Sequence, residues 1–257
     1  MSTKKAISTS YGKENKYDDD IFFQKYSQMS RSQQGLAGAG EWETLRKLLP
    51  DFKDKRVLDL GCGYGWHCIY AMEHGASSVV GVDISHKMLE VAKEKTHFPQ
   101  VEYKCCAIED VEFPEESFDV ILSSLAFHYV ADYEILVKKI YRILKSGGKL
   151  VFTVEHPVFT AYGTQDWYYN EKGEILHFPV DNYYYEGKRT AVFLGEKVTK
   201  FHRTLTTYLN TLLSNGFIIN HIVEPQPPEY MMDIPGMQDE MRRPMMLIVS
   251  ANKKVDR

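Results

Sequence analysis

The chain has 257 residues, of which 44% are apolar, and its formal net charge is −4 at pH 7. This length and apolar content predict a single compact domain, residues 1–257, with a core of its own. The acidic balance and the lack of a dense Lys/Arg block argue against a nucleic-acid partner, so a small-molecule partner is expected.

The N-terminal segment is polar and lacks the apolar stretch of a signal peptide, and nowhere do about 18 apolar residues follow one another. We therefore expect a cytoplasmic protein with no membrane partner. The four cysteines show no paired CxxC spacing, which argues against a zinc site and against a disulfide framework. No metal is expected.

The first elements along the chain are helical. Phe22, Phe23, Tyr26 and Met29 recur at helical spacing, and a second apolar stripe runs from Trp42 until Pro50 stops it. We expect residues 1–50 to form a helical cover.

Residues 51–156 alternate between strand and helix patterns. The runs "KRVLDL", "SSVVGVD", "FDVILSS" and "KLVFTVE" are short and mostly apolar, and amphipathic stretches separate most of them. Such alternation is typical of a parallel sheet that is covered by helices on both faces. The pattern predicts a doubly wound α/β fold, with this segment as its ligand-binding core.

The alternation stops at residues 157–200, which are rich in Tyr, Gly and charge. The segment is too long for a simple loop and has no helical period, so we expect an inserted β-rich cap that acts as a substrate lid. Its aromatic residues would cover an apolar acceptor, although an ordinary hairpin or a dimer contact explains them equally well. They are Trp167, Tyr168, Tyr169, Tyr183, Tyr184 and Tyr185. Residues 201–257 return to the sheet.

The stretch "VLDLGCGYG" places Gly61, Gly63 and Gly65 directly after the first strand of the core. A glycine turn here lets a ligand approach main-chain N–H groups and the positive end of a helix dipole. Trp66 stands where a nicotinamide-binding turn needs its last glycine, which argues against a dinucleotide. Asp83 ends the next strand, where a carboxylate can accept hydrogen bonds from both hydroxyls of a ribose.

These motifs resemble the class I S-adenosylmethionine-dependent methyltransferases, particularly the small-molecule group with ubiquinone/menaquinone-biosynthesis-like enzymes. "VLDLGCGYG", "VVGVDIS", "FPEESFDVILSSLAFHYV" and "ILKSGGKLVFTVEHP" match four motifs of this family. The resemblance is close over roughly residues 40 to 155. It implies a Rossmann-like fold of seven mostly parallel strands, the last antiparallel, and S-adenosyl-L-methionine as cofactor.

The resemblance also implies a set of cofactor contacts. Asp83 would hold the ribose, Ile84 would lie against the adenine, and Tyr26 or Arg31 would reach the cofactor's carboxylate, although a plain packing helix explains the N-terminal segment equally well. Asp59 either braces the turn or contacts the cofactor's amino group through water. The full implied set is Tyr26, Arg31, Asp59, Gly61, Cys62, Gly63, Asp83, Ile84, Ile108 and Ser124. Ala107 stands where many relatives carry an acidic residue for the adenine amino group, so Glu109 or water would have to replace it.

Methyl transfer from a sulfonium requires mainly alignment, so few catalytic residues are expected. His128 is the first candidate for a base or an acceptor-positioning group and His156 the second, while a structural role is as plausible for each. The prediction is a methyltransferase that acts on O, N or C of a small molecule. A nicotinamide-dependent oxidoreductase and a catalytically silent cofactor-binding protein remain alternatives, and the acceptor and the choice between monomer and homodimer stay open.

Overall fold

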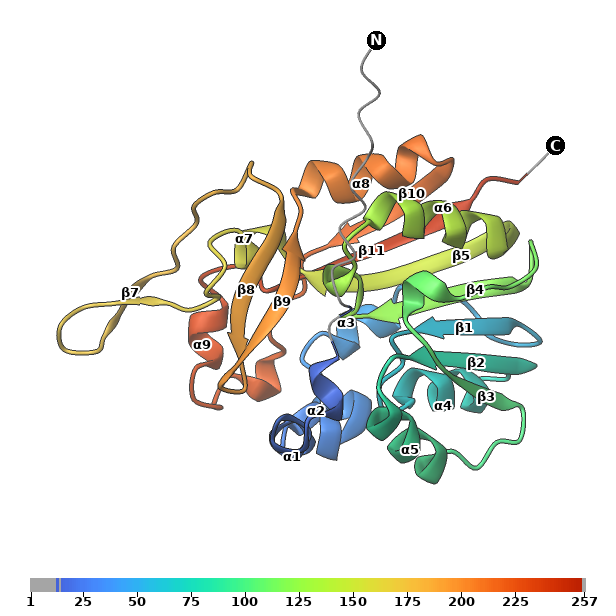
Figure 1. Cartoon of the computed structure of the whole chain (residues 1–257), viewed down its shortest axis with the longest axis horizontal. Helices are drawn as coiled ribbons and strands as arrows, with labels where there is room; N and C mark the ends of the chain where they lie inside the picture. Colours follow the sequence, from blue (N-terminus) through green and yellow to red (C-terminus); the bar gives the residue numbers. More distant parts are fainter. Residues whose placement is uncertain (1–12, 14, 256–257) are drawn as a thin grey trace, which may run out of the picture.

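The fold is built on a seven-stranded sheet in the computed structural model, which describes residues 13 and 15–255 (Figure 1). The strands are β1 (Arg56–Leu60), β2 (Ser78–Asp83), β3 (Val101–Cys105), β4 (Phe118–Ser124), β5 (Leu144–Glu155), β10 (Phe217–Val223) and β11 (Met246–Lys253). Their order across the sheet is β10-β11-β5-β4-β1-β2-β3, and β11 runs antiparallel to both of its neighbours. The predicted doubly wound, mostly parallel fold is confirmed.

Helices cover both faces of the sheet, which explains why its central strands carry buried apolar residues at consecutive positions, such as Val120, Ile121 and Leu122 of β4. One face packs against α6 (Tyr133–Ile143) and α8 (Leu205–Ser214), and Leu58 of β1 points into this layer. The other face packs against α3 (Trp42–Arg46), α4 (Trp66–Glu73) and α5 (His86–Lys95), where Val57 is buried. Each fully buried aliphatic side chain of this kind stabilises the fold by about 1.5–3 kcal/mol.

Side-chain caps fix where the helices begin at the carboxyl edge of the sheet. Ser85 Oγ accepts a hydrogen bond from the Met88 N–H at the start of α5, and Asp132 accepts one from the Ile135 N–H at the start of α6. A cap of this kind contributes about 1 kcal/mol. Because Ser85 caps α5, the carboxylate of Asp83 is not used for that purpose.

The N-terminal cover consists of η1 (Lys16–Asp18), α1 (Asp20–Ser27), α2 (Ser30–Gln33) and η2 (Gly35–Gly38). Asp18 accepts hydrogen bonds from Ser85 Oγ (2.6 Å) and from the Lys87 N–H (3.2 Å). These bonds attach the cover to the carboxyl end of β2. Residues 1–12 and 14, which the prediction included in the cover, lie outside the described residues.

The insertion after β5 forms two antiparallel hairpins, as the expected β-rich cap requires. It begins with α7 (Pro157–Thr160), then β6 (Tyr168–Tyr169) pairs with β7 (Ile175–His177), and β8 (Gly187–Phe193) pairs with β9 (Glu196–His202). The segment around β7 extends away from the sheet, whereas β8 and β9 lie beside it (Figure 1). Phe22 of α1 packs against Ala191 and Val198, so the cap also supports the N-terminal cover.

Short elements complete the chain: η3 (Ile108–Asp110), η4 (Phe127–Tyr129), η5 (Glu229–Met231) and α9 (Met237–Glu240). Over residues 13 and 15–255, no helix has both the length and the apolar character needed to cross a membrane.

Candidate active site

A cavity of about 500 Å³ opens at the carboxyl edge of the sheet. Its walls come from the N-terminal cover, the ends of β1, β2, β4 and β5, the β8–β9 hairpin and the segment 225–245. Nine of the predicted site residues line it: Tyr26, Arg31, Gly61, Gly63, Asp83, Ile84, Ile108, Ser124 and His128. Asp59, Cys62 and His156 do not.

The three glycines of the turn have different reasons to be glycine. All adopt the left-handed conformation, with φ of 79° at Gly61, 52° at Gly63 and 75° at Gly65. A Cβ on Gly61 would lie 2.4 Å from the Cβ of Ala126, and one on Gly65 would lie 2.2 Å from Tyr103 Oη. A Cβ on Gly63 would meet nothing within 4 Å, and this glycine lines the cavity. The open space beside Gly63 therefore leaves room for a ligand, whereas close packing against Ala126 and Tyr103 excludes a side chain at Gly61 and at Gly65.

Asp83 connects the end of β2 to the glycine turn. Its Oδ2 accepts a hydrogen bond from the Gly63 N–H (2.9 Å), and its Oδ1 accepts one from the Ser85 N–H (2.9 Å). Burial raises the pKa of this carboxyl, and the two backbone hydrogen bonds oppose that shift. Each oxygen keeps a lone pair for a further hydrogen bond, and the residue lines the cavity.

An apolar part of the cavity lies next to Asp83. Ile84, Met88 and Ile108 line it, as expected of a slot for a flat heteroaromatic base. Ala107 and Glu109 line the same cavity. Glu109 therefore lies within the site. A residue that replaces the acidic side chain missing at Ala107 would have to lie there.

Asp59 and Cys62 lie behind the turn and are buried. Asp59 Oδ2 accepts a hydrogen bond from the Cys68 thiol (3.5 Å), and its Oδ1 has no hydrogen-bond partner within the described part of the chain. Burial raises the pKa of Asp59 to about 7. The Cys62 N–H donates to the carbonyl of Val82 (2.9 Å), so this residue helps to shape the turn.

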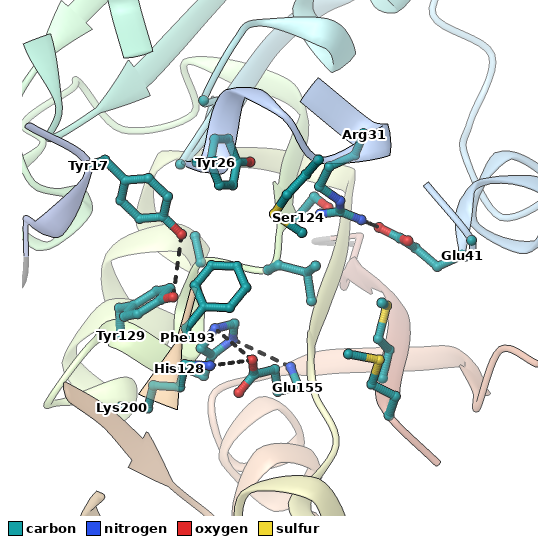
Figure 2. Close-up of a pocket in the computed structure, with 18 of the residues that line it drawn as sticks. Tyr17, Tyr26, Arg31, Glu41, Ser124, His128, Tyr129, Glu155, Phe193 and Lys200 are labelled. Atoms are coloured by element: carbon teal, nitrogen blue, oxygen red, sulfur yellow. Dashed lines mark hydrogen bonds and ion pairs between the residues drawn. The ribbon is translucent and has the colours of Figure 1, made fainter. Parts of the chain in front are cut away.

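The N-terminal cover brings two of the predicted residues into the cavity. Tyr26 comes from α1 and Arg31 from α2, and Figure 2 shows both side chains at the same end of the site. Arg31 Nη2 forms an ion pair with Glu41 Oε1 (2.5 Å), whose side chain is buried. The guanidinium is thereby held in place beside the cavity.

A polar group that we call the Glu155 cluster consists of Glu155, His128, Lys200 and Gln165. Lys200 Nζ lies 2.5 Å from Glu155 Oε1, and Gln165 Nε2 donates to Glu155 Oε2 (2.5 Å). The Glu155 N–H donates to His128 Nδ1 (3.4 Å), and His128 Nε2 lies 4.0 Å from Glu155 Oε1 (Figure 2). Burial lowers the pKa of His128 to about 4, so the imidazole is neutral at pH 7.

His156, the second catalytic candidate, does not line the cavity and caps the short helix α7 instead. Its Nδ1 accepts a hydrogen bond from the Val158 N–H (3.1 Å) at the start of α7, and its Nε2 lies 2.9 Å from Glu224 Oε1.

The expectation that aromatic residues of the insertion cover the acceptor also needs correction. None of its six Tyr and Trp residues named above lines the cavity, and Tyr184 is 88% exposed. The hairpin contributes Phe193 and Lys200 in their place.

The sequence analysis missed a wall of the cavity that is made of methionines, which we call the methionine wall. It comprises Met29, Met231, Met237, Met245 and Met246. Pro225, Pro227 and Ile234 extend it. Most of these residues fall in a segment, residues 225–246, that has no clear helical or strand period. Six of the ten methionines of the chain fall within residues 231–246, a density that marks an adaptable apolar surface.

Comparisons with known proteins agree with this geometry. A family model described as a methyltransferase domain matches residues 58–152. The crystal structure of an S-adenosylmethionine-dependent methyltransferase from Mesorhizobium loti is 41% identical, covers 85% of this chain and 100% of its own, and has a TM-score of 0.78. A Listeria monocytogenes protein assigned to the same class is 58% identical, with a TM-score of 0.82 over 86% of this chain and 99% of its own.

The chain belongs to the S-adenosylmethionine-dependent methyltransferases. Its cofactor is S-adenosyl-L-methionine, and the open space at Gly63, the free lone pairs of Asp83 and the slot beside Ile84 fit that molecule. A Coxiella burnetii ubiquinone biosynthesis O-methyltransferase is 36% identical over 112 residues, which are 43% of this methyltransferase and 47% of the relative. Family membership disfavours the nicotinamide alternative.

Proposed function

We propose that this methyltransferase transfers the methyl group of S-adenosyl-L-methionine to O, N or C of a small-molecule acceptor with an apolar body. One observation carries the proposal. The cavity that is lined by the predicted cofactor residues is also lined by the methionine wall and by Glu155, His128 and Lys200. The cavity thus offers an apolar surface and a polar end beyond the residues that serve the cofactor, which are the two features a small amphipathic acceptor needs.

In this proposal the cofactor lies along the ends of β1 and β2. Asp83 accepts hydrogen bonds from the ribose hydroxyls, Ile84 and Ile108 enclose the adenine, and the amino-acid part lies over Gly61 and Gly63. Tyr26 and Arg31 hold its carboxylate, Ser124 lines the far side, and Asp59 and Cys62 support the turn from behind. When bound, the cofactor supplies an electrophilic methyl group on a sulfonium.

The protein's own contribution is placement and exclusion of water. The N-terminal cover is attached to the sheet through Asp18, and Lys25 of α1 donates to the carbonyl of Leu194 in the cap (2.9 Å). A site closed in this way holds the acceptor's nucleophile in line with the methyl group, and alignment of this kind supplies several kcal/mol of the barrier reduction, about 7–11 at its upper range. His128 acts as a positioning group at the polar end.

A panel assay tests the proposal. The protein is incubated with S-adenosyl-L-methionine and small aromatic hydroxy, amino and carbon-acid compounds, and formation of S-adenosylhomocysteine and of methylated product is measured. We expect at least one compound to be methylated, and Asp83→Asn to reduce that activity. Normal cofactor binding with no transfer to any compound would favour the silent cofactor-binding protein, and methylation of added RNA or protein would exclude a small acceptor.

A further inference from the structure

The Glu155 cluster contains a positive and a negative side chain, and the two differ in the bonding capacity that they keep for a ligand. Lys200 Nζ donates to Glu155 Oε1 (2.5 Å) and to Gln165 Oε1 (2.8 Å). It also lies 5.9 Å from the ring centre of Tyr129 and 5.4 Å from that of Phe193, and the side chain is only 3% exposed. Two of the three N–H groups of the ammonium are thus bonded, two aromatic rings lie near it, and its charge is already paired with Glu155, which disfavours an anionic acceptor at this position.

His128 does not present a free base to the cavity either. Its Nδ1 accepts the Glu155 N–H, and an imidazole that accepts at one nitrogen when neutral carries its hydrogen on the other. The hydrogen is thereby assigned to Nε2, which faces Glu155 Oε1 at 4.0 Å. The Nε2–H group of His128 thus lies near the carboxylate, at a distance too long for a direct hydrogen bond.

Glu155 has the opposite character. Each of its oxygens receives one hydrogen bond, from Lys200 and from Gln165, and keeps a further lone pair. Burial raises the pKa of this carboxyl, but His128, the Lys200 charge and the two hydrogen bonds outweigh that effect and bring the pKa below its usual range. Glu155 is thus an ionised acceptor of hydrogen bonds on the cavity wall.

We propose, on the basis of the proposed function, that Glu155 binds the O–H or N–H of the acceptor's nucleophile and takes its proton. The acceptor is then a hydroxy or amino compound. The nucleophile forms a bond to the methyl carbon as the carbon–sulfur bond breaks, and that electron pair stays on sulfur. The proton moves to Glu155 and then to solvent, which balances the loss of the sulfonium charge. The alkylated atom is far more acidic than its parent, so even a weakly basic carboxylate accepts the proton.

The proposal assigns a defined role to the inserted cap. Lys200 comes from β9 and Gln165 from the segment between α7 and β6, so two cap residues keep the carboxylate ionised and oriented. The methionine wall would contact the acceptor's body, and its sulfur atoms favour an aromatic one. The preferred acceptor class is therefore a phenol or an aromatic amine.

Matched pairs of small molecules test the hydrogen requirement. Phenol with anisole, and aniline with N,N-dimethylaniline, are titrated into the protein saturated with S-adenosylhomocysteine, and affinities are measured by ligand-observed NMR. We expect the O–H or N–H member to bind roughly tenfold more tightly, the value of one hydrogen bond to a charged group. Glu155→Gln removes the charge but keeps one acceptor oxygen, so it should weaken the preference, and Glu155→Leu should abolish it. Equal binding within each pair, or a preference that survives Glu155→Leu in the folded protein, would overturn the assignment.

A matched control separates this effect from the loss of any buried ion pair. Glu116 pairs with the buried Lys253 (3.3 Å), neither residue lines the cavity, and Glu116→Gln should leave the preference intact. If no fragment binds while S-adenosylhomocysteine binds normally, the small-molecule proposal itself fails. If fragments bind without preference, only the role of Glu155 fails.

The pH profile of transfer tests the role of the cap residues. The charged or titratable groups that act on Glu155 are His128 and Lys200, and Arg203 in turn lowers the pKa of His128. Lys200→Met removes the main fixed charge, so the acid limb of kcat/KM, measured with the accepted compound, should move to higher pH. Gln165→Leu should move it less and should preserve the fold if Lys200→Met does not. An unchanged acid limb in both folded variants would refute the role of the cap.

Discussion

Asp83 offers a direct test of the cofactor site, because Asp83→Ala removes one carboxylate that bonds the turn and that, in the proposed function, also binds the ribose. The Gly63 and Ser85 N–H groups would lose their acceptor, and hydrogen bonds to charged groups are each worth about 1.5–3 kcal/mol. Part of that loss is offset, because burial of the carboxylate is unfavourable and raises its pKa. We expect the free energy of unfolding to fall by about 2 kcal/mol.

The effect on the cofactor adds to the effect on the fold. The ribose would lose its hydrogen bonds to the carboxylate, and a net loss of about 2–3 kcal/mol corresponds to roughly a 30- to 150-fold weaker affinity. Asp83→Asn keeps one acceptor oxygen, so its affinity should lie between that of Asp83→Ala and that of the wild type. Calorimetric titration with S-adenosylhomocysteine measures the affinities, and urea denaturation measures the stabilities.

Asp119 supplies the matched control for this measurement. Its carboxylate accepts a hydrogen bond from the Arg56 N–H (2.9 Å) and pairs with Lys145 (2.9 Å), but it does not line the cavity. Asp119→Ala should therefore destabilise the fold and leave affinity unchanged. Unchanged affinity in a folded Asp83→Ala protein would remove Asp83 from the site. An equal loss of affinity in Asp119→Ala would show that general destabilisation is the cause.

Two further predictions concern the turn. Gly63→Ala adds a Cβ in open space, so the protein should fold and bind the cofactor roughly tenfold more weakly. In Gly61→Val the new Cβ would lie 2.4 Å from that of Ala126, so the melting temperature should fall markedly. Equal melting temperatures of the two variants would contradict this expectation. Burial raises the pKa of Asp59 from its ordinary value of 3.8 to about 7, so its stabilising contribution is full below pH 3.8 and is lost as pH rises through 7. Without cofactor, Asp59→Asn should flatten the pH dependence of stability across this range, and an unchanged slope in chemical denaturation would count against the raised pKa.

The cofactor half of the site could be predicted because its residues are local in sequence. Each strand end brings its own contact, so Gly63, Asp83, Ile84 and Ile108 are fixed once the strand–turn–helix order is known. The sequence did not show which contact requires a given residue type at each of these positions. Gly61 lines the cavity as the sequence suggests, but the close contact that excludes a side chain there is with Ala126, which follows β4 far along the chain.

Most of the proposed acceptor side, with the exception of His128, could not be predicted, because its residues come from separate segments with no shared period. Met29 belongs to the N-terminal cover, whereas Met237 and Met246 lie near the C-terminal end of the fold. Aromatic density in the insertion was a misleading signal, since Tyr168 and Tyr184 are exposed. Lys200 gave no signal at all, because a lysine in a strand is ordinarily solvated.

The arrangement of the insertion also shows why it is more than a detachable lid. β8 and β9 pair along their full length, one side of the hairpin buries Phe22 of the cover, and Lys200 reaches Glu155. Loss of β8 would therefore remove the support of the N-terminal cover together with that of the cluster that we propose binds the acceptor. The β6–β7 hairpin is different, because its exposed tyrosines do not line the cavity. Within the insertion, we therefore expect the β8–β9 hairpin to be the part that both proposed ligand sites require.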